Sequence, residues 1–304
     1  MPKERLHILL AQESSRLVGE LGGRGSPAGQ THLLAAILPD LFFYDLPTFK
    51  LGSYGSRLHR FEGRAAVDFC RDWLREDGAH LKQVHKQWMF GFAGHFLADG
   101  WLHPLINGNC RRFGGDFKLT FKSCHHWLES ELEAYWLAAI GPADGFLPLL
   151  DGLAQQPERA TEVLSFLRVF LTRAGLTPMP SEDVMRRCFS RQVRLLRLFA
   201  HPRWTAIRPW LIRFRATQSF GVLLAPPQTF LPLAAAEKVE GCNIRSHSPN
   251  PYGPLNRPQQ GAPAGSYRGA TALPPEIEAM FKPGFMAQTI LHLSSHLLEL
   301  AKLF

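Results

Sequence analysis

The stretch from Trp88 to Asn107, WMFGFAGHFLADGWLHPLIN, constrains the fold more than any other part of the chain. It is apolar enough for a buried helix, yet His95, Asp99 and His103 occur in it at four-residue intervals. On an α-helix such residues share one face, one turn apart. A buried carboxylate between two imidazoles is costly unless something charged satisfies it, and a divalent metal does so. The spacing therefore predicts a metal site on a buried helix; an ordinary core helix with hydrogen-bonded histidines is the alternative.

The rest of the chain has helical patterns and no convincing strand alternation or repeat, which predicts an all-α fold. Pro104 disfavours helical geometry at the residue before it, so we expect the helix over 80–103 to fray at His103 and a loop over 105–121. We also expect residues 41–61 to be loop-like. Further helices are predicted at 3–21, 31–38, 62–76, 123–139, 145–154, 158–174, 181–200, 203–215, 228–240 and 284–303.

The length of 304 residues suits one large helical domain, which we expect over residues 1–244. Residues 245–283 are rich in Pro and Gly and are predicted to form an irregular loop, followed by a C-terminal helix over 284–304 that packs on the same domain. No apolar run approaches the ~18 residues of a membrane span, and we recognise no secretory signal. The five cysteines lack C-x2-C spacing, which predicts reduced thiols. Because no secretory signal is recognised, we expect a cytoplasmic protein.

A second pair of candidate ligands follows the first. His125 and Glu129 are four residues apart on the helix expected from Ser123, whereas we expect the neighbouring His126 to point elsewhere. Earlier in the chain, His7 lies in the first predicted helix and Asp40 in a Pro-Asp turn. His59 lies near the end of the loop-like, aromatic run that follows. The candidate metal ligands, in chain order, are His7, Asp40, His59, His95, Asp99, His103, His125 and Glu129.

This ordered set resembles the zinc-dependent phospholipase C family, whose fold is shared with the S1/P1 nucleases. The resemblance extends from about His7 to Leu137, nearly half of the chain. Its most specific parts are LPDLFFY at 38–44, LHRF at 58–61, GHFLADGWLHPLI at 94–106 and HHWLE at 125–129. It implies a multi-helical bundle with the metal site between helices, and an enzyme that hydrolyses phosphoester bonds.

The resemblance also implies roles for individual residues at the first two metal ions. His59, His95 and Asp99 would hold one zinc ion. Asp99 would also bridge to a second ion, which His7 helps to hold. An aspartate suits this role because it has two acceptor oxygens. His32, eight residues before Asp40, is the alternative to His7 as the first ligand.

At the third ion the resemblance implies His103, His125 and Glu129 as ligands. Asp40 matches the acidic residue that the family places beside the attacking water, and it is therefore the candidate catalytic base. Secreted members of the family use an N-terminal tryptophan as a ligand, whereas this chain begins Met-Pro, so we expect two or three zinc ions. The spacing from Asp99 to His103 is also two residues shorter than in the secreted enzymes, which indicates a bacterial intracellular branch.

A basic segment follows the candidate metal ligands. No acidic residue occurs between Val184 and Ala236, but nine arginines do. Among these arginines are interleaved Phe199, Trp204, Trp210 and Phe214. With a net charge of +8, this favours an anionic partner. We expect residues 186–215 to contact an anionic membrane surface or a phosphate-bearing substrate; a solvated helix pair whose arginine stems cover the core is the alternative.

The sequence thus predicts a zinc-dependent hydrolase of phosphoester bonds, similar to phospholipase C, that acts on a phosphodiester such as a phospholipid. One alternative is a single-strand nuclease on the same scaffold, although no base-stacking pocket is indicated and nucleic acid is not the favoured substrate. The other alternative is a metal-stabilised binding protein without turnover.

Overall fold

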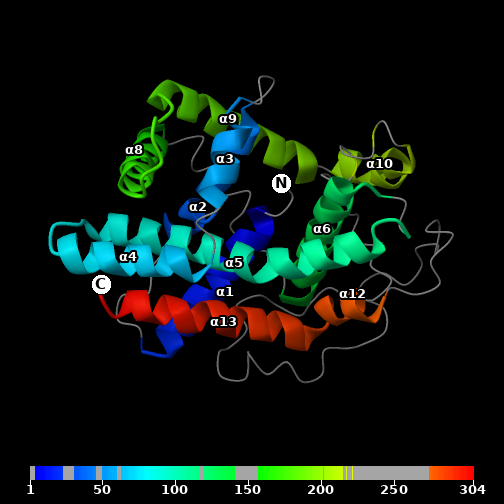
Figure 1. Ribbon diagram of the computed structural model, residues 1–304, viewed down its shortest axis with the longest axis horizontal. Helices are drawn as coiled ribbons and strands as arrows, with labels where there is room; N and C mark the ends of the chain where they lie inside the picture. The colour runs from blue at the N-terminus through cyan, green and yellow to red at the C-terminus, as the bar shows by residue number, and fades with distance from the viewer. Residues whose placement is uncertain are drawn as a thin grey trace. The chain divides into compact units, whose positions relative to one another are not determined.

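A computed structural model describes residues 4–22, 31–45, 50–59, 63–116, 119–140, 157–200, 202–214, 217, 221 and 274–304 (Figure 1). Within these ranges all regular structure is helical and no strand occurs, which confirms the predicted all-α class. The helices are α1 (Glu4–Glu20), α2 (Thr31–Ala35), the 3-10 helix η1 (Leu38–Tyr44), α3 (Gly52–Leu58), α4 (Arg64–Asp77), α5 (Gln83–Phe113), α6 (Phe121–Ile140), α8 (Pro157–Arg173), α9 (Glu182–Ala200), α10 (Pro202–Arg213), α12 (Pro275–Met280) and α13 (Pro283–Ala301).

None of the described helices is long and apolar enough to cross a membrane. The helices predicted at 145–154 and 228–240 lie outside the described residues. The short helix α12 falls inside the segment 245–283 that was predicted to be irregular.

The expected end of the long metal-bearing helix at Pro104 is wrong, because α5 continues through Pro104 to Phe113. Proline removes one backbone donor and frees the carbonyl four residues earlier. Pro104 lies on the exposed side of α5, where water can satisfy that carbonyl. The expected loop over 41–61 is also wrong in part, since η1 and α3 occupy about half of it.

The chain forms two compact units. One, called the α6 unit, comprises Met1–Leu6, His103–Ala143 and Leu198–Thr289. The other, called the α4 unit, comprises His7–Leu102, Asp144–Arg197 and Ile290–Phe304. Helices α1, α5, α9 and α13 contribute residues to both units.

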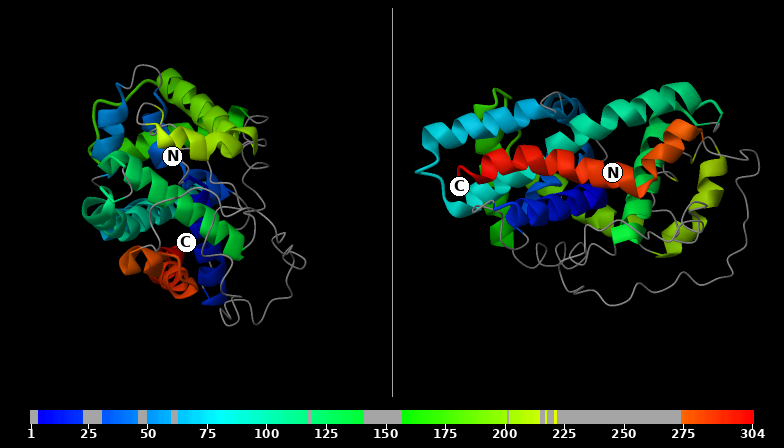
Figure 2. Two further views of the ribbon diagram at one scale, coloured as in Figure 1. Left: turned by 90° about the vertical axis from the view of Figure 1, so that its right-hand side faces the viewer. Right: turned by 90° about the horizontal axis from the view of Figure 1, so that it is seen from below.

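In the α4 unit, the helices α4, α5 and α13 lie side by side (Figures 1 and 2). Helix α4 buries residues spaced at three and four positions, as an amphipathic helix does. Its Trp73 ring stacks on Phe166 of α8, with the ring centres 5.6 Å apart. The Arg71 guanidinium on its outer edge lies 3.6 Å from the Glu299 carboxylate of α13. Aromatic packing therefore forms the interior of this unit, with ion pairs at its rim.

Gly91 of α5 allows α2 to approach closely. A Cβ atom at this position would lie 2.2 Å from the carbonyl oxygen of His32 and 2.7 Å from the Cβ of Ala35. The first of these is a backbone atom, which cannot move without displacing the whole helix. The missing side chain of Gly91 therefore sets the distance between α2 and α5, one turn before His95.

In the α6 unit, Arg208 fixes α10 to α6. Its side chain is buried, with Nη1 donating to Glu131 Oε1 at 2.7 Å and Nη2 donating to Ser130 Oγ at 2.8 Å. A buried guanidinium is tolerated where a carboxylate compensates its charge. Helix α12 packs on α6 through Phe281, whose ring centre lies 5.6 Å from that of Tyr135.

Candidate metal centres

Five of the predicted ligands meet in the α4 unit. Asp99 and His95 lie one turn apart on the buried face of α5, and their neighbours are His7 of α1, Asp40 of η1 and His59, which caps the C-terminus of α3. We call these five residues the His–Asp cluster. All are buried except His59, whose side chain is 9% exposed, so His59 marks the side from which solvent can enter.

Three donor atoms of the His–Asp cluster form an almost equilateral triangle. The Nε2 atoms of His59 and His95 lie 3.3 Å apart, and Asp99 Oδ2 lies 3.3 Å from each of them. Zinc binds nitrogen and oxygen at about 2.0–2.1 Å with tetrahedral geometry, so two of its ligands lie about 3.3–3.4 Å apart. The triangle therefore has the size of one face of a zinc coordination tetrahedron.

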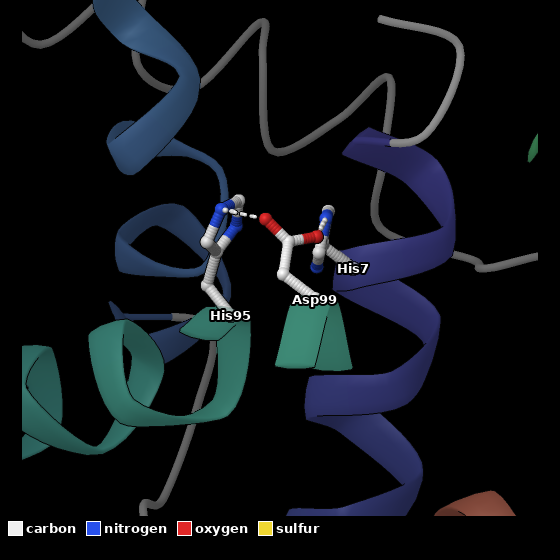
Figure 3. Close-up of side chains that lie close together, drawn as sticks. All are labelled: His7, His95 and Asp99. Atoms are coloured by element: carbon white, nitrogen blue, oxygen red, sulfur yellow. Dashed lines mark ion pairs between the residues drawn. The ribbon is translucent and has the colours of Figure 1, made fainter. Parts of the chain in front are cut away.

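The two oxygens of Asp99 face different partners. Oδ2 faces His59 and His95, whereas Oδ1 lies 3.2 Å from Nε2 of His7. Figure 3 shows the Asp99 carboxylate between the rings of His95 and His7. This is the arrangement that a carboxylate bridging two metal ions requires.

Backbone carbonyls orient two of these imidazoles. Nδ1 of His95 lies 2.8 Å from the carbonyl oxygen of Ala36, and Nδ1 of His59 lies 2.8 Å from that of Gly55. A carbonyl oxygen only accepts, so each Nδ1 carries the proton and donates it. In the neutral ring, Nε2 then presents its lone pair to the cluster. Metal-binding histidines in proteins are commonly held in this way through their second nitrogen.

The donor set therefore fits a divalent metal. Two Nε2 lone pairs directed at each other across 3.3 Å, beside a carboxylate, would repel in the absence of a positive charge. Neutral imidazole nitrogen and carboxylate oxygen are the usual non-thiolate ligands of zinc. The chemistry of the five side chains thus agrees with the metal site that the sequence predicts.

Burial keeps His7 neutral. Its pKa is lowered to about 4, chiefly because burial penalises the charged ring and also because of the nearby His95 imidazole, although Asp99 opposes the shift. At neutral pH the His7 ring is therefore uncharged and retains a lone pair. The His7 and His95 rings are stacked with their centres 4.0 Å apart, which holds both next to Asp99.

The remaining three predicted ligands meet in the α6 unit and form the His–Glu cluster. Glu129 Oε1 lies 2.9 Å from Nε2 of His125, one turn earlier on α6, and 3.4 Å from Nε2 of His103 on α5. Glu129 is buried, and the two histidines are half-buried. Nδ1 of His125 lies 2.9 Å from Asn107 Oδ1, so here a side-chain amide can fix the ring.

The expectation that His126 points elsewhere is wrong. Its Nδ1 lies 3.3 Å from the second oxygen of Glu129, Oε2. The sequence carried a signal for this contact, because residues three apart on a helix are neighbours just as those four apart are. Asn107 was missed as well, although it is four residues after His103 on the same helix.

The structure places His7, and not His32, beside Asp99. His32 is buried on α2, with its ring edge toward Phe90. Among the described residues, the groups whose donor atoms can surround one ion are His7, His95 and Asp99; Asp40, His59 and His95; and His103, His125 and Glu129. Asp40 belongs to the second group because its Oδ1 lies 3.0 Å from His59 Nε2. No ion type is indicated by these positions alone.

Comparison of the chain with protein-family models, curated proteins and solved structures finds no match. What the two clusters do must therefore be inferred from their positions and chemistry.

Proposed function

We propose that the protein is a zinc-dependent hydrolase of phosphoester bonds, similar to phospholipase C. The observation that carries the proposal is the Asp99 carboxylate, whose two oxygens face separate sets of histidines. A shared carboxylate holds two ions close together, and paired ions are a recurrent means of cleaving phosphate esters. The order of the eight ligands along the chain, which resembles that family, supports the same reaction class.

Each proposed metal ion would have its own set of ligands. His59, His95 and Asp99 would hold one ion, and His7 together with Asp99 would hold the second. A third would be held by His103, His125 and Glu129. Bound zinc would supply positive charge to the phosphoryl oxygens and lower the pKa of the attacking water.

The protein's own contribution is rigidity and partial exclusion of solvent. The Ala36 and Gly55 carbonyls fix the rings of His95 and His59, so the donor atoms need no rearrangement when substrate arrives. Within the His–Asp cluster His59 is the ligand nearest to solvent, and we expect the substrate phosphate to approach from its side. The buried ring of Phe96 lies against those of His59 and His95, which lowers the local dielectric.

Asp40 carries two proposed roles, catalytic base and metal ligand. The substitution Asp40→Asn separates them, because an amide cannot take a proton. A fall in turnover of about 10²–10⁴-fold with zinc content retained assigns the base. A loss of zinc assigns Asp40 as a ligand, which its 3.0 Å contact with His59 would explain.

The test of the reaction class is a substrate panel on zinc-loaded protein. The panel contains a phosphocholine lipid, a soluble aryl phosphodiester and a single-stranded oligonucleotide. We expect cleavage of the lipid and the soluble diester by the wild type, none by Asp99→Ala, and undiminished cleavage by Asp68→Ala, which alters a half-buried carboxylate on α4 outside both clusters. Cleavage of the oligonucleotide alone would identify a nuclease. If the loaded wild type cleaves nothing, the protein is a metal-stabilised binding protein.

A further inference from the structure

Helix α10 presents an apolar face to solvent. Ile207 and Trp210 of α10, and Phe214 directly after its last residue, are 40%, 58% and 50% exposed, although all three are large apolar side chains. Ile207 and Trp210 are three residues apart and therefore share one side of the helix. The Trp210 and Phe214 rings contact each other edge to face, with their centres 4.9 Å apart. The result is a contiguous aromatic ridge.

A neighbouring side of α10 is held firmly. Leu211 and Arg208 are buried, and Arg208 donates to Glu131 and Ser130 of α6. Figure 1 shows α10 next to one end of α6. Because these anchors are about a quarter to a half turn from Trp210, the ridge cannot be buried by rolling the helix without breaking a buried ion pair. The exposure of the ridge is thus fixed by the fold.

The surroundings of the ridge are basic. Arg213 is exposed beside Phe214, and no acidic residue occurs in the sequence from Val184 to Ala236. A helix with Trp and Phe on one side, arginine next to them and no acidic residue is typical of peripheral helices that lie in the headgroup region of a membrane. Trp prefers this depth because its ring is apolar and its N–H group is polar.

We infer that α10 is a docking helix for an anionic phospholipid surface, with Trp210 and Phe214 inserted among the lipids and Arg213 at the headgroup phosphates. A second copy of the chain fits this face less well, because a two-fold contact would bring Arg213 and its basic neighbours against themselves. The inference concerns binding and holds whether or not the His–Asp cluster turns over substrate.

The experiment is vesicle co-sedimentation of the full-length zinc-loaded protein. Vesicles of phosphatidylcholine with 30 mol% phosphatidylserine are compared with vesicles of pure phosphatidylcholine, at ~0.05 M and ~0.5 M salt. We expect binding to the anionic vesicles that weakens with salt. The double variant Trp210→Ala/Phe214→Ala should weaken it at least tenfold, since most of the inserted apolar surface is gone. Arg213→Glu should weaken it mainly at low salt.

The matched control is Leu291→Ala on α13, where a single apolar side chain of similar exposure, 56%, has no aromatic partner on its face. This variant should bind vesicles as the wild type does. Equal binding by the wild type and the Trp210/Phe214 double variant would overturn the inference, and so would failure of the wild type to bind. If sedimentation velocity instead shows a dimer that the double variant dissociates, and vesicles are not bound, the ridge is a self-association surface. Co-sedimentation measures binding and does not depend on hydrolysis. A failure of the docking inference can therefore be told apart from a failure of the proposed reaction.

Discussion

At the scale of single residues, Asp99 is the side chain on which the proposed metal centre depends. Each of its oxygens faces a different histidine set, so no other residue of the His–Asp cluster can replace it. We predict that Asp99→Ala loses at least one equivalent of zinc, measured by elemental analysis of protein purified in zinc-containing buffer. Asp68→Ala, in the same unit, should retain the full content. Equal zinc in the wild type and Asp99→Ala would remove Asp99 from the centre.

Glu133 gives a prediction for pH. It is buried on α6, and burial raises its pKa to about 8; the Arg5 guanidinium, 3.7 Å away, only partly offsets this, and Glu4 adds to it. Between pH 4.5 and 8 the folded protein therefore keeps a proton that the unfolded chain releases. The unfolded state binds fewer protons, so stability falls as pH rises through this window, by at most about 1.4 kcal/mol per pH unit.

Glu133→Gln cannot ionise and should lack this fall. We predict that the melting temperature of the variant, relative to the wild type, rises steadily from pH 5 to pH 8, as measured by thermal unfolding at each pH. A constant difference across the range would show that Glu133 is ionised in the folded protein already at pH 5.

At this scale the sequence indicated which side-chain donors lie together, but it did not indicate the backbone carbonyls that orient the imidazole rings. Four-residue spacing marked His95, Asp99 and His103 as one row and paired His125 with Glu129. The structure brings His95 to Asp99 and His125 to Glu129, but it groups His103 with Glu129 in the other unit. The Ala36 and Gly55 carbonyls leave no trace in a sequence, because every residue has a carbonyl. The contact between His126 and Glu129 was missed for a different reason. The prediction relied on four-residue spacing, whereas His126 lies three residues before Glu129.

At the scale of helices, two glycines of α5 provide a matched pair. A Cβ at Gly91 would collide with the His32 carbonyl, whereas a Cβ at Gly94 would make an ordinary contact with Leu297 at 3.8 Å. We predict that Gly91→Ala destabilises the protein by about 1–3 kcal/mol, as overpacking does. Gly94→Ala should be neutral or stabilising by up to about 1 kcal/mol, because alanine favours the helix.

Chemical denaturation of both variants measures these effects. Gly91→Ala should also lower zinc affinity. Ala36 directly follows α2, so a displaced α2 would move the carbonyl that orients His95. Similar stabilities for the two variants would mean that α2 moves aside without cost.

Helix ends were harder to predict than helix positions. Pro104 was a sound reason to end α5, since proline removes a backbone donor. The sequence alone did not indicate that Pro104 lies on the exposed side of α5. There, water can replace the backbone hydrogen bond that proline removes. That information comes from tertiary packing alone.

At the scale of the whole molecule, each compact unit contains one complete cluster. The His–Asp cluster lies in the α4 unit and the His–Glu cluster in the α6 unit. Without metal, each unit would contain buried carboxylates and imidazoles whose lone pairs face one another, which costs free energy. The sequence predicted the all-α class and the candidate ligands that meet in the two clusters, but not this division, because it depends on contacts between segments far apart in the chain.

We predict that chelation lowers the melting temperature. A ligand that binds only the folded state stabilises it by about 2.7 kcal/mol at 100 times its Kd, and removing it reverses this gain. Differential scanning calorimetry before and after chelation measures the shift, and added zinc should restore it. The shift should be smaller in Asp99→Ala, which has less metal to lose. An unchanged melting temperature after confirmed removal of metal would contradict a structural role for the ions.

The hydrogen bonds from His95 and His59 to backbone carbonyls have a spectroscopic consequence. Because Nδ1 of each ring is committed as a donor, only Nε2 can change its bonding when a metal enters. In ¹⁵N spectra of the imidazoles, the Nε2 resonances should therefore shift on addition of zinc while the Nδ1 resonances keep their attached proton. With ¹¹³Cd in place of zinc, scalar coupling should appear at Nε2 and not at Nδ1, so one experiment shows which nitrogen of each ring binds the ion.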